Sequence, residues 1–149
     1  MHQLSLRKII SGGQSGADQA ALDAAIEAGI DHGGAIPAGR RTENGPLPLH
    51  YRMEVLGSAA YPVRTEKNVA DSDGTVIVSH GPLSGGSLLT YRIADKLLKP
   101  CIHLDLSVMP VYVASMRLFD WLHAQRITVL NVAGPRASSD PLIYRATRT

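Results

Sequence analysis

The sequence is poor in cysteine, aromatic residues and net charge. Its 149 residues include one cysteine, one Phe and one Trp, and the formal net charge is +2. One cysteine excludes an intrachain disulfide, and residues 1–7 show no signal-peptide pattern, so we expect a reducing cytoplasmic location. The small charge and scarce aromatic residues argue against a nucleic-acid partner or a membrane surface. No apolar run approaches the roughly 20 residues of a membrane span.

Apolar runs alternate with helical patterns along the chain, and the composition of 44% hydrophobic and 19% charged residues is typical of a globular protein. This alternation predicts one α/β domain over residues 1–149, with a doubly wound, mostly parallel Rossmann-like sheet flanked by helices. We expect strands at residues 9–10, 74–79, 101–106 and 127–133. We expect helices at residues 17–28, 63–72 with Thr65 as its cap, 89–98, 109–125, and from Asp140-Pro141 to Thr147. Residues 31–48 read as a long loop, and residues 51–61 could hold a short strand or a helical turn.

Three glycine-rich turns follow predicted strands, at residues 12–16, 84–87 and 134–138. Glycines let the backbone N–H groups point inward, and a helix N-terminus adds partial positive charge, so such turns can hold a phosphate or another oxyanion. In open α/β sheets the ligand binds outside the carboxyl ends of the strands. The three turns therefore predict one anion site, although short βα connections can also be glycine-rich without any ligand.

The first turn leaves two interpretations open. Ser15 and Asp18 have the spacing of a helix capping box, so Asp18 could bind backbone N–H groups or contact a ligand. If Gly13 touches the anion, Gly13→Asp should abolish binding while the fold survives. Arg40 and Arg41 could simply belong to a solvated turn.

Several motifs occur together in one order: Gly12 to Asp18, the Pro-Ala-Gly-Arg loop ending at Arg40, Arg64 to Val69, Ser84 to Thr90, and Asn131 to Arg136. Together they resemble the molybdenum cofactor carrier family, over almost the entire chain. That family belongs to a wider Rossmann-like superfamily with the Lonely-guy and DNA-processing nucleotide-binding proteins. The resemblance implies binding of molybdenum cofactor (molybdopterin) as cargo, or of a nucleotide or phosphate instead.

The resemblance also implies which residues bind the ligand: Gly12, Gly13, Gln14, Ser15, Gly16, Asp18, Arg40, Arg64, Thr65, Asn68, Ser84, Gly85, Gly86, Ser87, Thr90, Gly134 and Arg136. From the residues themselves we expect no catalytic residue and no metal ligand, because the six histidines are scattered and none pairs with another at helical spacing. Ser15 and Ser87 stand where the family pattern has Thr, and Ala35-Ile36 replaces an aromatic-Cys pair. The helix after the second turn carries Asp95 but no Glu, so the Lonely-guy hydrolysis of nucleoside monophosphates is not supported.

Three functions compete. The leading one is a carrier without chemistry, since no Ser/His/Asp or Cys/His arrangement is evident. The second is an enzyme that cleaves a phosphorylated N-glycoside with Asp18, Glu43, Glu54 or Glu66 as acid–base group. The third is a nucleotide-sensing module with a protein partner.

Assembly and partners follow mainly from the resemblance, which implies a homo-oligomer, with a tetramer favoured. Apolar residues on more than one face of residues 109–125 add a weaker indication. A molybdoenzyme is the expected recipient of a molybdenum cofactor cargo.

Overall fold

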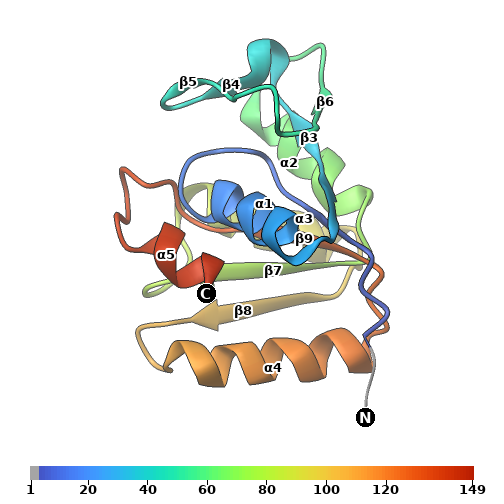
Figure 1. Ribbon diagram of the computed structural model, residues 1–149, viewed down its shortest axis with the longest axis vertical. Helices are drawn as coiled ribbons and strands as arrows, with labels where there is room; N and C mark the ends of the chain where they lie inside the picture. Colours follow the sequence, from blue (N-terminus) through green and yellow to red (C-terminus); the bar gives the residue numbers. More distant parts are fainter. Residues whose placement is uncertain (1–3) are drawn as a thin grey trace.

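The computed structural model describes residues 4–149, and its centre is a sheet of five parallel strands (Figure 1). In spatial order these strands are β2 (Asp31–Gly33), β1 (Lys8–Ile10), β9 (Val129–Ala133), β7 (Gly74–Ser79) and β8 (Cys101–Asp105). The predicted single α/β fold with a parallel central sheet is confirmed. Residues 1–3, part of the segment used for the signal-peptide expectation, lie outside the described residues. No helix of the described part is long and apolar enough to cross a membrane.

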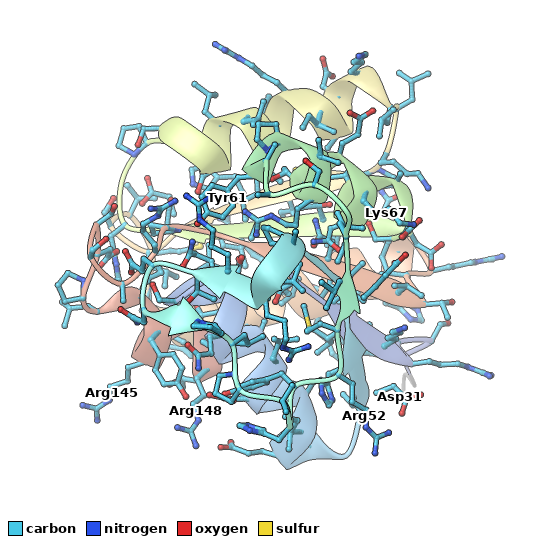
Figure 2. All side chains as sticks on the ribbon, turned by 90° about the horizontal axis from the view of Figure 1, so that it is seen from above. Asp31, Arg52, Tyr61, Lys67, Arg145 and Arg148 are labelled. Atoms are coloured by element: carbon cyan, nitrogen blue, oxygen red, sulfur yellow. The ribbon has the colours of Figure 1, made fainter. Side chains whose placement is uncertain are left out.

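Helices cover both faces of the sheet. Helices α1 (Ala17–Ala28), α4 (Val111–Ala124) and α5 (Ile143–Arg148) share one apolar core with β7, β8 and β9. Helices α2 (Tyr61–Ala70) and α3 (Gly85–Lys96) pack together on the other face, and Figure 2 shows the sheet between them and α1. All six residues of β7 are buried, which explains its β-branched sequence.

Residues 34–56 form an excursion above the sheet, the cyan part of Figure 1. It contains β3 (Ala35–Ile36), η1 (Ala38–Arg40), β4 (Arg41–Thr42), β5 (Gly45–Pro46) and β6 (Glu54–Val55). A second apolar cluster anchors the excursion to α1, because Ile36, Leu47 and Tyr51 pack with Leu22 of that helix. The prediction of one long loop over residues 31–48 was therefore wrong, since β2 and four short elements lie within it.

The starts of helices α2 and α5 differ from those predicted from the sequence. Helix α2 begins at Tyr61 with Pro62 in its first turn, where a missing N–H costs nothing. Thr65 lies inside the helix and its Oγ1 donates to the carbonyl of Tyr61 at 3.0 Å, so Thr65 is not the cap. Helix α5 starts at Ile143 rather than at Pro141, although a carboxylate oxygen of Asp140 accepts the N–H of Leu142 at 3.0 Å.

Helix α1 matches its predicted limits, and Gly29 ends it in the left-handed conformation. Its cap is Gly16, without a side-chain hydrogen bond. Ser15 therefore does not act in a capping box. The Asp18 side chain does bind a backbone N–H group of the first turn, because its carboxylate accepts the N–H of Gln14 at 3.3 Å.

Candidate functional site

A cavity of about 460 Å³ lies where the carboxyl ends of β1, β9 and β7 meet. The three glycine-rich turns and one side of α2 supply its walls. These strands are neighbours in the sheet, so turns distant in sequence converge at one edge. The residues proposed for the ligand that line this cavity are Gly12, Gln14, Asp18, Arg64, Thr65, Asn68, Ser84, Gly85, Gly86, Ser87, Thr90, Gly134 and Arg136.

Gln14 presents a buried donor without a partner. Its side-chain oxygen accepts the N–H groups of Ser15 at 3.0 Å and Glu43 at 2.8 Å. These two bonds fix which end of the amide is oxygen. The Nε2 group is then left without a hydrogen-bond partner among the described residues, and Gln14 is only 7% exposed. Such a group is costly unless a ligand or water accepts from it.

Asp18 and Arg64 form a buried ion pair beside Gln14. Arg64 Nη1 donates to Asp18 Oδ2 at 3.1 Å, and the two side chains are 13% and 8% exposed. Burial raises the pKa of the Asp18 carboxyl, while the Arg64 guanidinium and the N–H of Gln14 oppose that rise. Arg64 Nε has no partner among the described residues. Arg64 therefore keeps a donor for a ligand even while it is paired.

Three guanidinium groups gather around the ring of Tyr61, the first residue of α2; Figure 2 labels Tyr61. The guanidinium carbons of Arg41, Arg64 and Arg136 lie 5.3, 5.5 and 5.6 Å from the ring centroid. They come from β4, α2 and the turn after β9. The aromatic face stabilises each cation, but the cations repel one another. An anionic group among them would relieve that repulsion.

The second turn places the N-terminus of α3 at the cavity. Ser84 is the cap residue and makes no side-chain cap hydrogen bond. A Cβ added at Gly85 or Gly86 would meet no atom within 4 Å, so the backbone there borders open space. The N–H groups of this first helical turn and the helix dipole favour an anion.

Asn68 and Thr90 line the cavity, but their side chains already bind the protein. The Asn68 amide exchanges two hydrogen bonds with the backbone of Ala35, at 2.7 and 3.1 Å. Thr90 Oγ1 donates to the carbonyl of Gly86 at 2.9 Å. These contacts tie α2 to β3 and stabilise the first turn of α3. Both residues shape the cavity walls.

Four residues proposed for the ligand do not line the cavity. At Gly13 an added Cβ would lie 3.0 Å from side-chain atoms of Ile36 and Leu47, within the second apolar cluster. The prediction that Gly13→Asp abolishes binding while the fold survives is not tested, and at this position we expect a loss of stability as well, because the carboxylate would enter that cluster. Arg40 turns away and donates to the carbonyls of Leu47, Pro48 and Tyr51.

The other two residues, Ser15 and Gly16, hold the first turn against the third. The hydroxyl of Ser15 accepts the N–H of Ala137 at 3.1 Å. A Cβ at Gly16 would lie 2.5 Å from the carbonyl oxygen of Pro135, so only glycine permits this approach. Both residues support the cavity wall from behind.

Glu43 fastens the β4–β5 hairpin to the site. Its carboxylate accepts the hydroxyl of Ser15, and it accepts both the N–H of Ser138 at 3.1 Å and the hydroxyl of Ser138 at 2.5 Å. Hydrogen bonds from Ser138 and Ser15 lower the pKa of Glu43. The Glu43 carboxylate therefore already accepts hydrogen bonds from protein groups. Among the carboxylates considered for N-glycoside cleavage, only Asp18 lines the cavity.

Sequence reasoning missed several lining residues, namely Tyr61, His80, Asn131 and Asp140. It also missed Arg41, which lies over Tyr61. His80 Nδ1 lies 2.6 Å from Asp140 Oδ2, which joins the loops after β7 and β9. Sixty positions separate these two residues, so no local spacing indicates the pair. The Asn131 amide donates to Thr75 Oγ1 at 3.2 Å between the neighbouring strands β9 and β7.

A second hollow of about 490 Å³ is bordered by Lys8, His32, Arg52, Glu54 and Asp71, among others. Glu54 and Asp71 both pair with Lys67, and His32 accepts the N–H of Arg52. None of the buried side-chain atoms found without a partner borders this hollow. The cavity at the strand ends is therefore the better candidate site.

Comparisons with known proteins agree with the fold and with the resemblance seen in the sequence. A crystal structure of "Putative molybdenum carrier protein" from Syntrophus aciditrophicus SB matches with a TM-score of 0.97 and 49% identity, over 99% of this chain and 93% of that one. A search of curated proteins finds no significant match. The family model described as "Circularly permutated YpsA SLOG family" matches residues 9–149. Because this match spans nearly the whole sequence, the chain belongs to the circularly permutated YpsA SLOG family.

Proposed function

We propose that this protein binds a phosphorylated, anionic small molecule in the cavity at the strand ends, and that its cargo is molybdenum cofactor. The observation that carries the proposal is the pair of buried donors, Gln14 Nε2 and Arg64 Nε, which have no partner among residues 4–149 and belong to residues that line the cavity. Each unsatisfied buried donor costs about 1–3 kcal/mol. A ligand that accepts from both recovers that free energy on binding.

The donor set suits a phosphate. Arginine binds phosphate oxygens through two parallel N–H groups, and backbone N–H groups at a helix N-terminus complete the shell. Arg64, Arg136 and the first turn of α3 offer these elements around one cavity. Its volume of about 460 Å³ lies within the roughly 300–1,000 Å³ of small-molecule sites.

The name of the similar crystal structure favours molybdenum cofactor over other phosphorylated ligands. The cofactor's pterin carries a phosphate, which the arginines and the α3 N-terminus would hold. Its transfer to a recipient molybdoenzyme would make the protein a cytoplasmic carrier. A nucleotide has the same phosphate chemistry, so nucleotides belong in the same binding assay.

We also propose that the carrier is a homo-oligomer, with a tetramer favoured. Helix α4 leaves Tyr112 and Met116 69% and 63% exposed, and these apolar side chains would be covered in an assembly. Light scattering at micromolar concentration checks this, and a monomer mass would contradict it.

The test of binding uses Gln14→Glu, which keeps the accepting oxygen and replaces the unpaired donor by a negatively charged acceptor. We expect at least a tenfold loss of affinity for molybdenum cofactor, measured by titration of the purified protein. Gln125→Glu changes the net charge equally on an exposed residue at the end of α4 and should bind like the parent. Equal affinities of the two variants would contradict the proposed site.

Arg136→Ala tests the arginine cluster. Because Arg136 is exposed, we expect a loss of about 1 kcal/mol, or roughly fivefold in affinity. The matched control is Arg145→Ala, which removes an exposed arginine that points to solvent far from Tyr61 (Figure 2). If cofactor binds to neither the parent nor the variants, the carrier proposal is lost.

A further inference from the structure

The cavity contains a histidine–carboxylate pair that ligand binding alone does not require. His80 and Asp140 both line the cavity, and His80 Nδ1 lies 2.6 Å from Asp140 Oδ2. The other carboxylate oxygen accepts the N–H of Leu142 at 3.0 Å, which fixes the orientation of the carboxylate. The carboxylate thus holds the ring from one side.

This contact decides which ring nitrogen can accept a proton. A carboxylate accepts only, so Nδ1 carries the hydrogen and Nε2 has the free lone pair. No hydrogen bond to Nε2 is found among residues 4–149. A base whose orientation is fixed by a carboxylate, with its second nitrogen free beside a ligand cavity, is the arrangement that activates a nucleophile.

The position of His80 indicates which bond it could act on. His80 follows β7 directly, and the same loop leads to the N-terminus of α3 at Gly85. A phosphate at that helix N-terminus would lie beside the loop that carries His80. Gln14 lines the same cavity, and its buried Nε2, which has no partner among the described residues, gives independent evidence for a ligand there. Arg64 and Arg136 line the same cavity and would bind a second anionic group there.

We infer that His80 acts as a general base that hydrolyses a diphosphate-linked ligand, with Asp140 as its positioning residue. This inference rests on the proposed binding of a phosphorylated ligand. Water attacks one phosphorus, a new P–O bond forms, and the bridging P–O bond breaks. One water proton goes to His80 Nε2 and then to solvent. The bond electrons leave with the second phosphate, so the products are two phosphate monoesters.

The choice of a diphosphate follows from the groups present. A phosphate leaving group departs as an anion and needs no proton, whereas an alcohol would need an acid beside it. The arginines stabilise the charge that develops on the leaving phosphate. Two anion-binding regions in one cavity also match a ligand with two phosphates. The pair therefore fits a nucleotide diphosphate linkage better than a simple phosphate ester.

The experiment uses the full chain with NAD⁺, FAD and adenosine diphosphate ribose as probes. Release of adenosine monophosphate is followed by chromatography, and ¹⁸O from labelled water should appear in one product phosphate. His80→Asn keeps a donor for Asp140 but lacks Nε2, so we expect kcat to fall at least 100-fold with unchanged probe affinity and melting temperature. His50→Asn, an exposed histidine outside the cavity, is the control.

Asp140→Asn keeps the acceptor for Leu142 but removes the charge that orients His80. We expect kcat to fall at least tenfold with KM unchanged, and Asp140→Glu to restore part of it. Probes that bind but are never cleaved would overturn the inference and leave the binding proposal standing. Failure of every probe and of molybdenum cofactor to bind would overturn both. A kcat of His80→Asn equal to that of the parent would show that His80 is not the general base.

Discussion

Replacing Arg64 by Gln tests how the buried ion pair contributes to stability. Arg64 holds the carboxylate of Asp18 at 3.1 Å, and both side chains are almost enclosed. Glutamine keeps much of the stem that covers Gly12 but removes the charge. The carboxylate is then left buried, with the backbone N–H groups of Gln14 and Gly12 as its remaining hydrogen-bond donors. We expect the variant to fold with clearly reduced stability.

The magnitude depends on pH. Breaking a buried pair from one side costs about 3–5 kcal/mol when the remaining charge cannot be neutralised. Asp18 can instead take up a proton, because burial already raises its pKa above the usual 3.8 and loss of Arg64 raises it further. The folded chain then holds a proton that the unfolded chain releases. The contribution of Asp18 to the stability of the variant is therefore greatest below pH 3.8 and is lost as pH rises through the folded pKa, by at most about 1.4 kcal/mol per unit.

Urea unfolding between pH 5 and pH 8 measures the pH dependence of the free energy of unfolding. The proteins compared are the parent, Arg64→Gln, Asp18→Asn and the double variant. The double variant should recover about 3 kcal/mol relative to the sum of the single changes at pH 8. Lys67→Gln removes an exposed partner of Asp71 and should change stability little. A loss of stability in Arg64→Gln that does not depend on pH, together with single-variant losses that simply add in the double variant, would refute a buried ion pair between Arg64 and Asp18.

Two further predictions concern the space around two glycines and the reactivity of the Cys101 thiol. Gly13→Ala should lose about 1–3 kcal/mol in urea unfolding, because its Cβ would press on Ile36 and Leu47 from a left-handed backbone. The Cβ added in Gly86→Ala meets no atom within 4 Å, so this variant should be as stable as the parent but bind anions more weakly in titration. Reduced stability with unchanged anion affinity would contradict the placement of Gly86 at the anion site. Burial raises the pKa of the Cys101 thiol from 9.0 to about 11, so alkylation at pH 8 should be about 100-fold slower in folded than in urea-unfolded protein. Equal alkylation rates would show that the thiol is accessible and unperturbed.

The sequence predicted the central architecture well because its signals there are local and strong. The run at residues 74–79 became β7 with the same limits, and α1 ends at Gly29 as expected. Glycine-rich turns after three strands predicted one shared edge, and the neighbouring positions of β1, β9 and β7 produce it. Parallel connectivity is sufficient for that inference, because it brings all carboxyl ends to the same side.

The excursion over residues 34–56 could not be predicted, since its strands are two residues long and pair only with one another. β3 pairs with β6, and β4 pairs with β5. Such short segments have no periodicity of their own. The same limit applies to His80 and Asp140, whose contact exists only after two loops have been brought together by the sheet.

Arg40 and Arg41 show why residue type and neighbourhood alone cannot assign a ligand contact. Arg40 has a positive φ of 55° and binds three backbone carbonyls of the following loop, so it closes the excursion. Arg41 begins β4 and lies over Tyr61. Arg40 therefore positions the strand that brings Arg41 to Tyr61, which lines the cavity. Loss of binding after removal of Arg40 would reflect the displaced hairpin, and only a change at Arg41 reports on the charge beside the ligand.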